Sequence, residues 1–303
     1  MDDTDDAQAL ADRFEAHRGR LRAVAYRMLG SLTEAEDAVQ ETWLKLSRSD
    51  TGDIRNLGGW LTTVVGRVCL DLLRSRTARR EQPMDEGYGT FVPDPVIEPL
   101  TETDPEQQVL RADAVGLALL VVLDTLEPAE RLAFVLHDMF AVPFDDIAPI
   151  VERGTAATRQ LASRARRRVR GAAPSAEPDP ARQREVVEAF LAASRAGDFD
   201  ALLAVLDPAV VLRADSGALV RGAAASEVVH GAKAVAGQAL LFGRFAAHGR
   251  YALVGGAVGI VNVVDGRPQS VMGVTVADGR ITALYILADP ERLAALAVPD
   301  GDG

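Results

Sequence analysis

Residues Phe144 to Arg170 constrain the fold of this chain more than any other stretch, because they predict two helices joined by a tight turn. Gly154 is expected to permit the bend, and Thr155 is expected to cap the second helix. In the second helix, apolar residues recur every four positions, which predicts one buried ridge. The ridge consists of Ala157, Leu161, Ala165 and Val169.

The other side chains of this second helix are mostly basic or polar. Seven arginines and no acidic residue occur from Arg153 to Arg170. An amphipathic helix that presents arginine, glutamine and serine after a turn is typical of a helix-turn-helix that enters the major groove of DNA. A solvated arginine-rich face is the alternative. The candidate DNA-binding residues are Thr158, Arg159, Gln160, Ser163, Arg164 and Arg167.

Charge is unevenly distributed along the chain. The 33 basic and 44 acidic residues give a net charge of −11, so attraction to phosphates has to come from local basic runs. A second run, Arg67–Arg80, holds five arginines against Asp71. An acidic DNA-binding protein should bind DNA poorly alone, and we expect a partner that supplies affinity. The length of 303 residues allows two or three small domains.

Several classes of protein are disfavoured. Cys69 is the only cysteine, which rules out an internal disulfide and makes a metal cluster implausible. The acidic start does not match a signal peptide. The longest apolar stretch, Tyr251–Val264, is too short and contains too much glycine to span a bilayer. We expect a soluble, cytoplasmic protein with no membrane contact, no metal and no cofactor.

Three helices are predicted in the first block, residues 9–80. The first covers Ala9–Leu29 and ends at Gly30. Thr33 and Glu36 form a capping-box pattern that starts the second, Glu34–Leu46. A third is expected from about Gly58 to Ser75.

The residues of these helices resemble a known family. The sequences Ala-Tyr-Arg-Met-Leu-Gly-Ser (25–31), Glu-Ala-Glu-Asp-Ala-Val-Gln-Glu-Thr-Trp-Leu (34–44) and Gly-Trp-Leu-Thr-Thr-Val-Val-Gly-Arg-Val-Cys-Leu-Asp-Leu-Leu-Arg-Ser-Arg (59–76) resemble region two of extracytoplasmic-function (ECF) RNA polymerase sigma factors. The block 127–170 is similar to region four. The resemblance implies that 9–80 binds core polymerase and the minus-ten promoter element, and that 106–171 binds the minus-thirty-five element.

The resemblance also implies roles for single residues. It places Asp37, Gln40, Glu41 and Trp43 against the β′ clamp helices of core RNA polymerase, whose β subunit is the other expected partner. It places Arg74, Arg76, Arg79 and Arg80 near the minus-ten element of promoter DNA. Spacing alone favours the opposite interpretation of the first set, with Trp43 in the core and the acids on a solvated face.

Residues 81–105 are predicted to link the two helical blocks. Five prolines lie within Gln82–Pro105, a density that argues against regular structure. The resemblance implies that this acidic linker threads toward the active-site channel of the polymerase, where it could mimic nascent RNA. A plain flexible tether is the alternative.

Residues 180–297 change to an α+β pattern. Asp265-Gly266 and Asp278-Gly279 separate β runs, a strong hairpin signal. Helices followed by a curled antiparallel sheet are expected. The helices are 181–195, 199–206, 232–245 and 291–295, and the strands are 209–213, 249–254, 259–264, 270–276 and 281–288.

The sequence Val-Val-Glu-Ala-Phe-Leu-Ala-Ala-Ser-Arg-Ala-Gly-Asp-Phe-Asp-Ala-Leu-Leu (186–203) resembles a SnoaL-like domain, a cone-shaped fold found at the end of sigma-J-type factors. The expected architecture is therefore two all-α domains followed by an α+β cone. The resemblance implies that this domain tunes activity in cis, with Asp215, Ser216 and Gly217 in a regulatory loop and a small ligand as a possible partner. The sign of the tuning stays open.

Two other functions are compatible with parts of this pattern. One is a helix-turn-helix regulator with a ligand-binding domain, which leaves residues 9–80 unexplained. The other is a SnoaL-like isomerase or cyclase, which needs a carboxylate base and an acid across an apolar cavity. The polar candidates for that chemistry are Asp215, Tyr251, Tyr285, His230 and His248.

Overall fold

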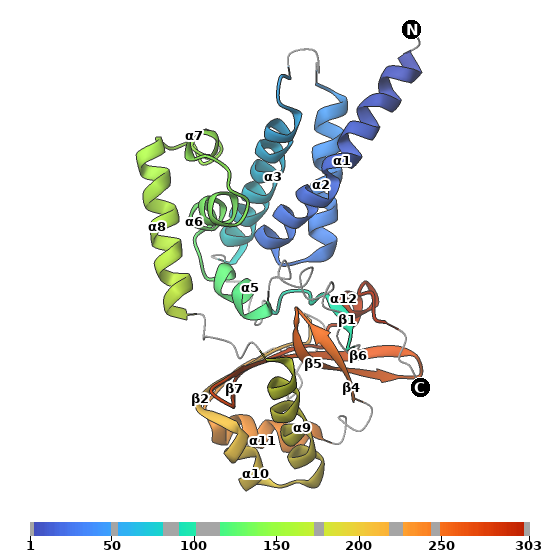
Figure 1. Cartoon of the computed structure of the whole chain (residues 1–303), viewed down its shortest axis with the longest axis vertical. Coiled ribbons are helices and arrows are strands. Elements are labelled where there is room, and N and C mark those ends of the chain that lie inside the picture. The colour runs from blue at the N-terminus through green and yellow to red at the C-terminus, as the bar shows by residue number, and fades with distance from the viewer. Residues whose placement is uncertain are drawn as a thin grey trace. The chain divides into compact units, whose positions relative to one another are not determined.

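The computed structural model describes residues 3–49, 54–80, 91–100, 116–172, 179–217, 227–243 and 249–299. They form two compact units (Figure 1). A helical unit joins Met1–Met84 to Val122–Ala172, and a C-terminal unit joins Asp85–Val121 to Ala173–Gly303. This grouping differs from the predicted division, because linker residues and the start of the second helical block belong to the C-terminal unit.

The helical unit contains the three long helices expected at its start. Gly30 separates the first two in a left-handed conformation (φ 71°). The second helix is capped by Ser31, whose hydroxyl accepts a hydrogen bond from the Glu34 backbone N–H (3.4 Å), so the predicted cap at Thr33 is wrong by two residues. The helices of this unit are α1 Asp3–Leu29, α2 Leu32–Ser47, α3 Leu57–Arg80, the end of α5 Leu117–Asp124, α6 Pro128–Phe134, a π-helical turn Val135–Met139, α7 Phe144–Ile147 and α8 Thr155–Ala172.

One core joins the two helical blocks of this unit. Gly66 in α3 faces the side chains of Leu132, Leu136 and Ile150 from the second block. A Cβ built at Gly66 would lie 3.4–3.7 Å from them, which is van der Waals contact. All three are fully or almost fully buried, so α3 is packed directly against the second block.

Arg131 is buried within this shared core. Only 2% of its side chain is exposed. Its Nε donates a hydrogen bond to the Arg27 carbonyl in α1 (3.2 Å), and its Nη1 pairs with Asp124 (3.2 Å). Burial lowers the pKa of Arg131 to about 10, so the guanidinium stays charged at neutral pH. The residue therefore ties α6 to α1 through a desolvated charge.

Burial also defines the chemistry of Cys69. Burial raises the pKa of the Cys69 thiol to about 12, so the thiolate is absent at neutral pH. We expect the folded full-length chain to react with a thiol-specific disulfide reagent at least about a hundredfold more slowly than the urea-unfolded chain. Equal rates, followed by absorbance, would contradict the described packing.

The C-terminal unit is built on a seven-stranded sheet with strand order β1-β4-β5-β6-β7-β2-β3. β2 and β7 are parallel, so the sheet is mixed, whereas an antiparallel sheet was expected. β1 comes from the segment predicted to lack regular structure and pairs with β4, with Ile97 opposite Val254. The strands are β1 Ile97–Pro99, β2 Leu206–Asp215, β3 Glu227–His230, β4 Gly249–Val254, β5 Ala257–Val264, β6 Arg267–Ala277 and β7 Arg280–Leu287. β3 was not predicted.

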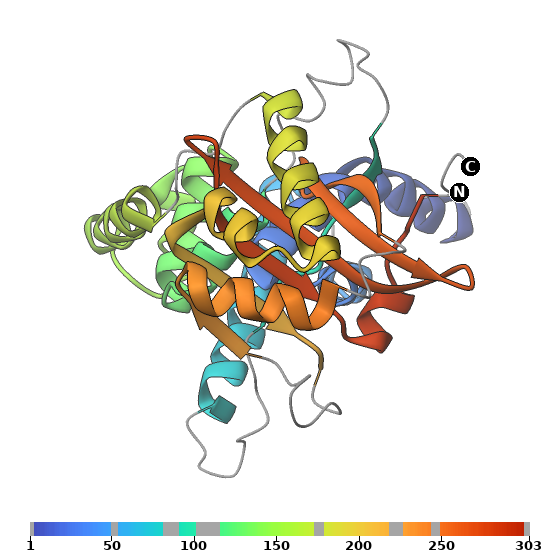
Figure 2. The ribbon, with the colours of Figure 1, turned by 90° about the horizontal axis from the view of Figure 1, so that it is seen from below.

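Three helices cover one face of this sheet (Figure 2). They are α9 Pro180–Ala196, α10 Phe199–Val205 and α11 Ala232–Phe242, and a short helix, α12 Pro290–Ala294, follows β7. Their apolar side chains and those of the strands form one buried core, which includes Phe190, Val235 and Leu284. Both predicted Asp-Gly hairpins are confirmed, since Asp and Gly have positive φ in each (51° and 73°; 50° and 71°).

No described helix has the length and apolarity needed to cross a membrane. The described residues also contain no group of three or more histidine, cysteine, aspartate or glutamate side chains placed to hold a metal ion.

Candidate nucleic-acid interface

The turn before α8 differs from the predicted one. Its left-handed residue is Glu152 (φ 57°), and a Cβ built at Gly154 would meet open space, so the prediction that Gly154 permits the bend is wrong. Thr155 donates a hydrogen bond through its hydroxyl to the Asp145 carboxylate (2.8 Å). A side-chain hydrogen bond between the two helices therefore fixes the turn.

The fully buried ridge of α8 shares only Ala165 with the predicted one. It consists of Thr158, Ala162 and Ala165, all fully buried. Thr158 satisfies its hydroxyl by donating to the Gly154 carbonyl (3.1 Å), which is how a polar residue can occupy this inner position. Thr158 therefore does not lie on the exposed face, and we remove it from the DNA-binding candidates.

The exposed face of α8 keeps the other five candidates. Arg166 is half-buried and Arg168 is exposed, but both form ion pairs within the helical unit. Arg166 forms two hydrogen bonds with Asp138 (2.7 and 3.1 Å), and Arg168 pairs with buried Glu130 (3.2 Å). These two arginines hold α8 on the rest of the unit. The exposed residues are Arg159, Gln160, Ser163, Arg164 and Arg167.

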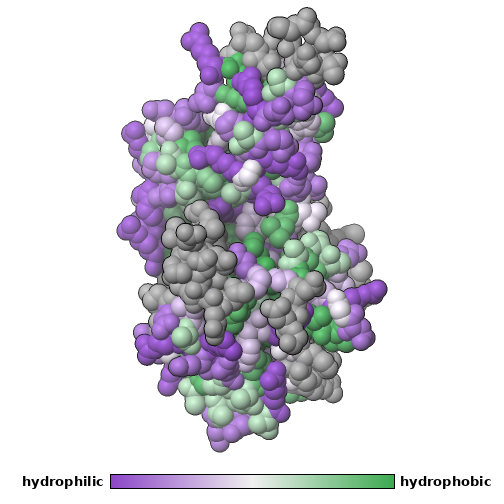
Figure 3. Space-filling model, turned by 45° about the vertical axis from the view of Figure 1, so that its right-hand side comes forward, coloured by the Kyte–Doolittle hydropathy of each residue, from purple (hydrophilic) through white to green (hydrophobic). Residues whose placement is uncertain are grey.

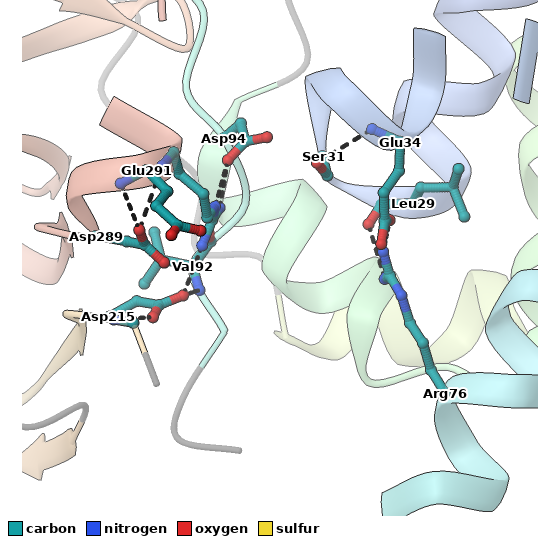
Figure 4. A network of polar contacts seen from close by, with 11 residues as sticks. Leu29, Ser31, Glu34, Arg76, Val92, Asp94, Asp215, Asp289 and Glu291 are labelled. Atoms are coloured by element: carbon teal, nitrogen blue, oxygen red, sulfur yellow. Dashed lines mark hydrogen bonds and ion pairs between the residues drawn. The ribbon is translucent and has the colours of Figure 1, made fainter. Parts of the chain in front are cut away.

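The second arginine cluster, at the end of α3, is smaller than predicted. Arg76 forms an ion pair with Glu34 and donates a hydrogen bond to the Leu29 carbonyl (3.1 Å), with only 19% of its side chain exposed (Figure 4, right). It fastens α3 to the corner between α1 and α2, so it is not a free DNA contact. Arg74 is half exposed, 3.8 Å from Asp71. The side chains of Arg79 and Arg80 lie outside the described residues.

One face of α2 carries most of the predicted polymerase-binding residues. Asp37, Gln40 and Glu41 are exposed, and Leu44 follows at the same helical spacing with 43% of its surface exposed. Trp43 is half-buried and packs on the Phe14 ring (centroids 5.1 Å apart). The exposed apolar residue of this face is therefore Leu44, which sequence reasoning missed although its spacing from Gln40 and Glu41 places it there.

On the face of the molecule seen in Figure 3, hydrophobic residues form small separate groups among hydrophilic ones.

One arginine of the C-terminal unit contacts the described part of the predicted linker. Arg292 in α12 donates from Nε to Asp94 (2.7 Å) and from Nη1 to Asp215 (2.7 Å). It also donates to the Val92 carbonyl, and its guanidinium lies 4.7 Å from the centre of the Phe91 ring. Figure 4 (left) shows Val92, Asp94 and Asp215 gathered around this contact. Residues 91–99 are thus fastened to the sheet at both Arg292 and β1.

Asp215 and Gly217, predicted in a regulatory loop, belong to this network. Asp215 is buried, and its carboxylate also accepts from the backbone N–H groups of Val92 (3.0 Å) and Gly217 (3.2 Å). Gly217 has positive φ (77°), and a Cβ there would lie 2.6 Å from the Asp289 carboxylate. Ser216 follows directly in the chain, while residues 218–226 of the loop lie outside the described part.

Comparison with known proteins identifies the family. Residues 13–79 match the Sigma-70 region 2 family model. The chain is 41% identical over 294 residues to the ECF RNA polymerase sigma factor SigJ of Mycobacterium tuberculosis, covering 92% of this chain and 91% of SigJ. This chain is an ECF sigma factor. It directs promoter-specific initiation of transcription by RNA polymerase.

Two further comparisons extend this match to the whole sigma factor. This chain is 36% identical over 299 residues to the probable ECF sigma factor SigI of M. tuberculosis, covering 96% of this chain and 97% of SigI. Its structure is similar to the crystal structure of M. tuberculosis SigJ, with a TM-score of 0.71, 38% identity, and coverage of 95% and 100% of the two chains.

The residues considered for isomerase chemistry do not converge where the structure describes them. A cavity of about 70 Å³ in the C-terminal unit is lined by Tyr285, but no carboxylate among the described residues lines it. Asp215 is bound to Arg292, and His230 is exposed on β3. Tyr251 packs against the helix-covered core, and His248 lies outside the described residues. The relatives are likewise sigma factors and not enzymes.

Proposed function

We propose that the exposed face of α8 reads the minus-thirty-five element, with residues 122–172 acting as region four. Support comes from five polar or basic side chains that share one exposed helix face, while Arg166 and Arg168 pair with Asp138 and Glu130 and so hold the helix in place. Arg74, with Arg79 and Arg80, is proposed to meet the minus-ten element. Promoter-specific transcription in a reconstituted assay with core polymerase tests the proposal. A helix-turn-helix regulator would instead bind its operator tightly in the absence of polymerase.

Arg164→Ala and Arg167→Ala are each expected to weaken promoter use by about 1–3 kcal/mol if a base edge is lost. Run-off transcription and binding of holoenzyme to a promoter with and without the minus-thirty-five element measure the effect. Arg250→Ala removes an exposed arginine of the C-terminal unit and serves as the control. Unchanged transcription in both α8 variants would show that the face is misassigned.

The acidic face of α2 is proposed to bind the β′ clamp helices, with Leu44 as its apolar centre. Leu44→Asp is expected to weaken binding to core polymerase by roughly 1–2 kcal/mol, because an exposed apolar contact is lost without disturbing the core. Competition for core polymerase against a second sigma factor measures this. Leu119→Asp, a change on a half-exposed leucine of α5, is the control, and an equal loss there would argue against a specific contact.

The C-terminal unit is proposed to tune activity in cis by holding the linker. The supporting observation is the capture of residues 91–99 by Arg292 and β4. A linker held on this sheet cannot at the same time follow a path through the polymerase, so the two states compete. Because this competition requires the polymerase, the tuning is expected to take place in the cytoplasm.

A further inference from the structure

The start of α5 is seated on the C-terminal sheet by one leucine. Leu117 is buried, and a Cβ built at Gly273 in β6 would lie 2.4 Å from Leu117 Cδ1, so a larger residue at position 273 would have to displace this side chain. Gly255 (φ 60°), at the β4–β5 turn, also lies close to Leu117. A Cβ built at Gly255 would be 3.2 Å from the backbone nitrogen of Leu117. Val274, the next residue of β6, points into the helix-covered core, so Gly273 faces the other side of the sheet.

The 70 Å³ cavity adjoins this seat, and Leu117 forms part of its wall. It is too small for a ligand as it stands, because binding cavities for drug-sized molecules are about 300–1,000 Å³. Removing one buried leucine side chain can, however, leave an apolar cavity of about 150 Å³ that binds benzene. The space would reach that range once Leu117 withdraws. Its other walls include Gln183, Val254, Val274, Thr275 and Tyr285.

The chemistry of these walls selects neutral ligands. Tyr285 is buried, and burial raises the pKa of its hydroxyl, so the phenol stays uncharged. No ionisable acid or base other than this phenol lines the cavity among the described residues. A hydroxyl or carbonyl group on a ligand could exchange hydrogen bonds with Tyr285, Thr275 or Gln183. A charged ligand would lose its hydration without gaining a counter-ion.

We propose that the seat of Leu117 is a small-molecule site, which a flat, neutral, apolar ligand with one hydroxyl or carbonyl group occupies in place of the leucine side chain. Leu117 is the first residue of α5, and the last residues of α5 belong to the helical unit. Ligand binding therefore frees the start of the helix that leads into the second helical block. The regulatory consequence, unlike the site itself, rests on the proposed cis tuning by the C-terminal unit.

Phenol is the probe, and the full-length chain is the protein tested. Calorimetric titration is expected to show that Leu117→Ala binds phenol about tenfold to a hundredfold more tightly than the wild type, which must first expel a buried leucine. Leu119→Ala, a half-exposed neighbour, should bind like the wild type. Benzoate, the charged counterpart, should bind none of the variants. If a thermal melt shows that Leu117→Ala does not fold, Leu117→Val is used instead. It should also bind phenol more tightly than the wild type, by a smaller factor.

Hydrogen exchange separates displacement from simple cavity filling. In the wild type, saturating phenol should speed exchange of the amides of 117–121, whereas benzoate should not. Gly273→Val should speed the same exchange without tight phenol binding, because valine evicts Leu117 and fills its seat. Equal phenol affinity in Leu117→Ala and Leu119→Ala, or unchanged exchange in phenol-saturated wild type, would overturn the proposal. Neither readout depends on transcription, so failure here is distinct from failure of the proposed function.

Discussion

Replacing Arg292 with methionine is expected to release residues 91–99 from the C-terminal sheet while the rest of that unit stays folded. The side chains of Asp94 and Asp215 are only 4% and 10% exposed, so loss of the arginine removes the charge that Arg292 contributes beside two buried carboxylates. Breaking a buried ion pair in this way costs about 3–5 kcal/mol. Release of β1, which has only three residues, relieves the cost more cheaply than unfolding six other strands.

Hydrogen exchange of full-length protein measures this release. A cost of about 3 kcal/mol corresponds to roughly a hundredfold faster exchange of the protected amides in 91–99, such as the Val92 N–H. Arg292→Lys should be intermediate, because lysine keeps the charge but cannot bridge three acceptors with a planar fork. Arg280→Met, which removes an arginine with one long hydrogen bond to Leu206, is the matched control.

The same variant connects the contact with activity. If the captured linker carries the cis tuning, Arg292→Met should change promoter-specific transcription in the same direction as deletion of residues 181–303. A fully released linker with unchanged transcription would separate the contact from regulation. Unchanged exchange in 91–99 would show that Arg292 does not hold the linker at all.

Arg131→Ala should destabilise the helical unit by about 3 kcal/mol or more. The change removes a large buried side chain and leaves the Asp124 carboxylate and the Arg27 carbonyl without their donor. Arg131→Met should cost much less. Methionine refills most of the volume, Asp124 is 22% exposed and can be hydrated, and one arginine nitrogen, Nη2, already lacks a hydrogen-bond partner.

Urea unfolding followed by tryptophan fluorescence isolates this effect, since both tryptophans, Trp43 and Trp60, lie in the helical unit. Arg22→Ala, at an exposed position of α1, is the control and should fall within about 0.5 kcal/mol of the wild type. Equal losses in Arg131→Ala and Arg131→Met would mean that the charge, and not the packing, carries the stability. Because Arg131 joins α6 to α1, the same variants should also loosen the second helical block from the first.

Features set by local sequence were predictable. The Asp-Gly hairpins and the helix stop at Gly30 (φ 71°) depend on backbone conformations that particular residues favour, and both occur where expected. The exposed side of α8 also followed from spacing. Its buried ridge did not, because a threonine can be buried when a carbonyl four residues earlier accepts its hydroxyl, and hydropathy alone does not reveal this.

Features set by distant partners were not predictable. Asp94 and Arg292 are separated by 198 positions, and nothing near either residue indicates the other. The prolines of the linker argued against a strand, yet β1 is an edge strand, where a missing N–H can be tolerated. Arg76 looked like a free cation because its partners, Glu34 and the Leu29 carbonyl, lie on other helices.

Capture of an early segment by strands that come much later in the chain has a consequence for synthesis. Residues 91–99 leave the ribosome well before β4 and α12 exist, and bacterial-type elongation of roughly 5–20 residues per second leaves an interval on the order of ten seconds. In the later part of that interval, after residue 172 is made, the helical segments are complete, but β4 and α12, which hold the linker, are not. A nascent chain therefore passes through a period in which its linker is not yet bound by the C-terminal unit. A polymerase close to the translating ribosome would meet the chain in this unrestrained state.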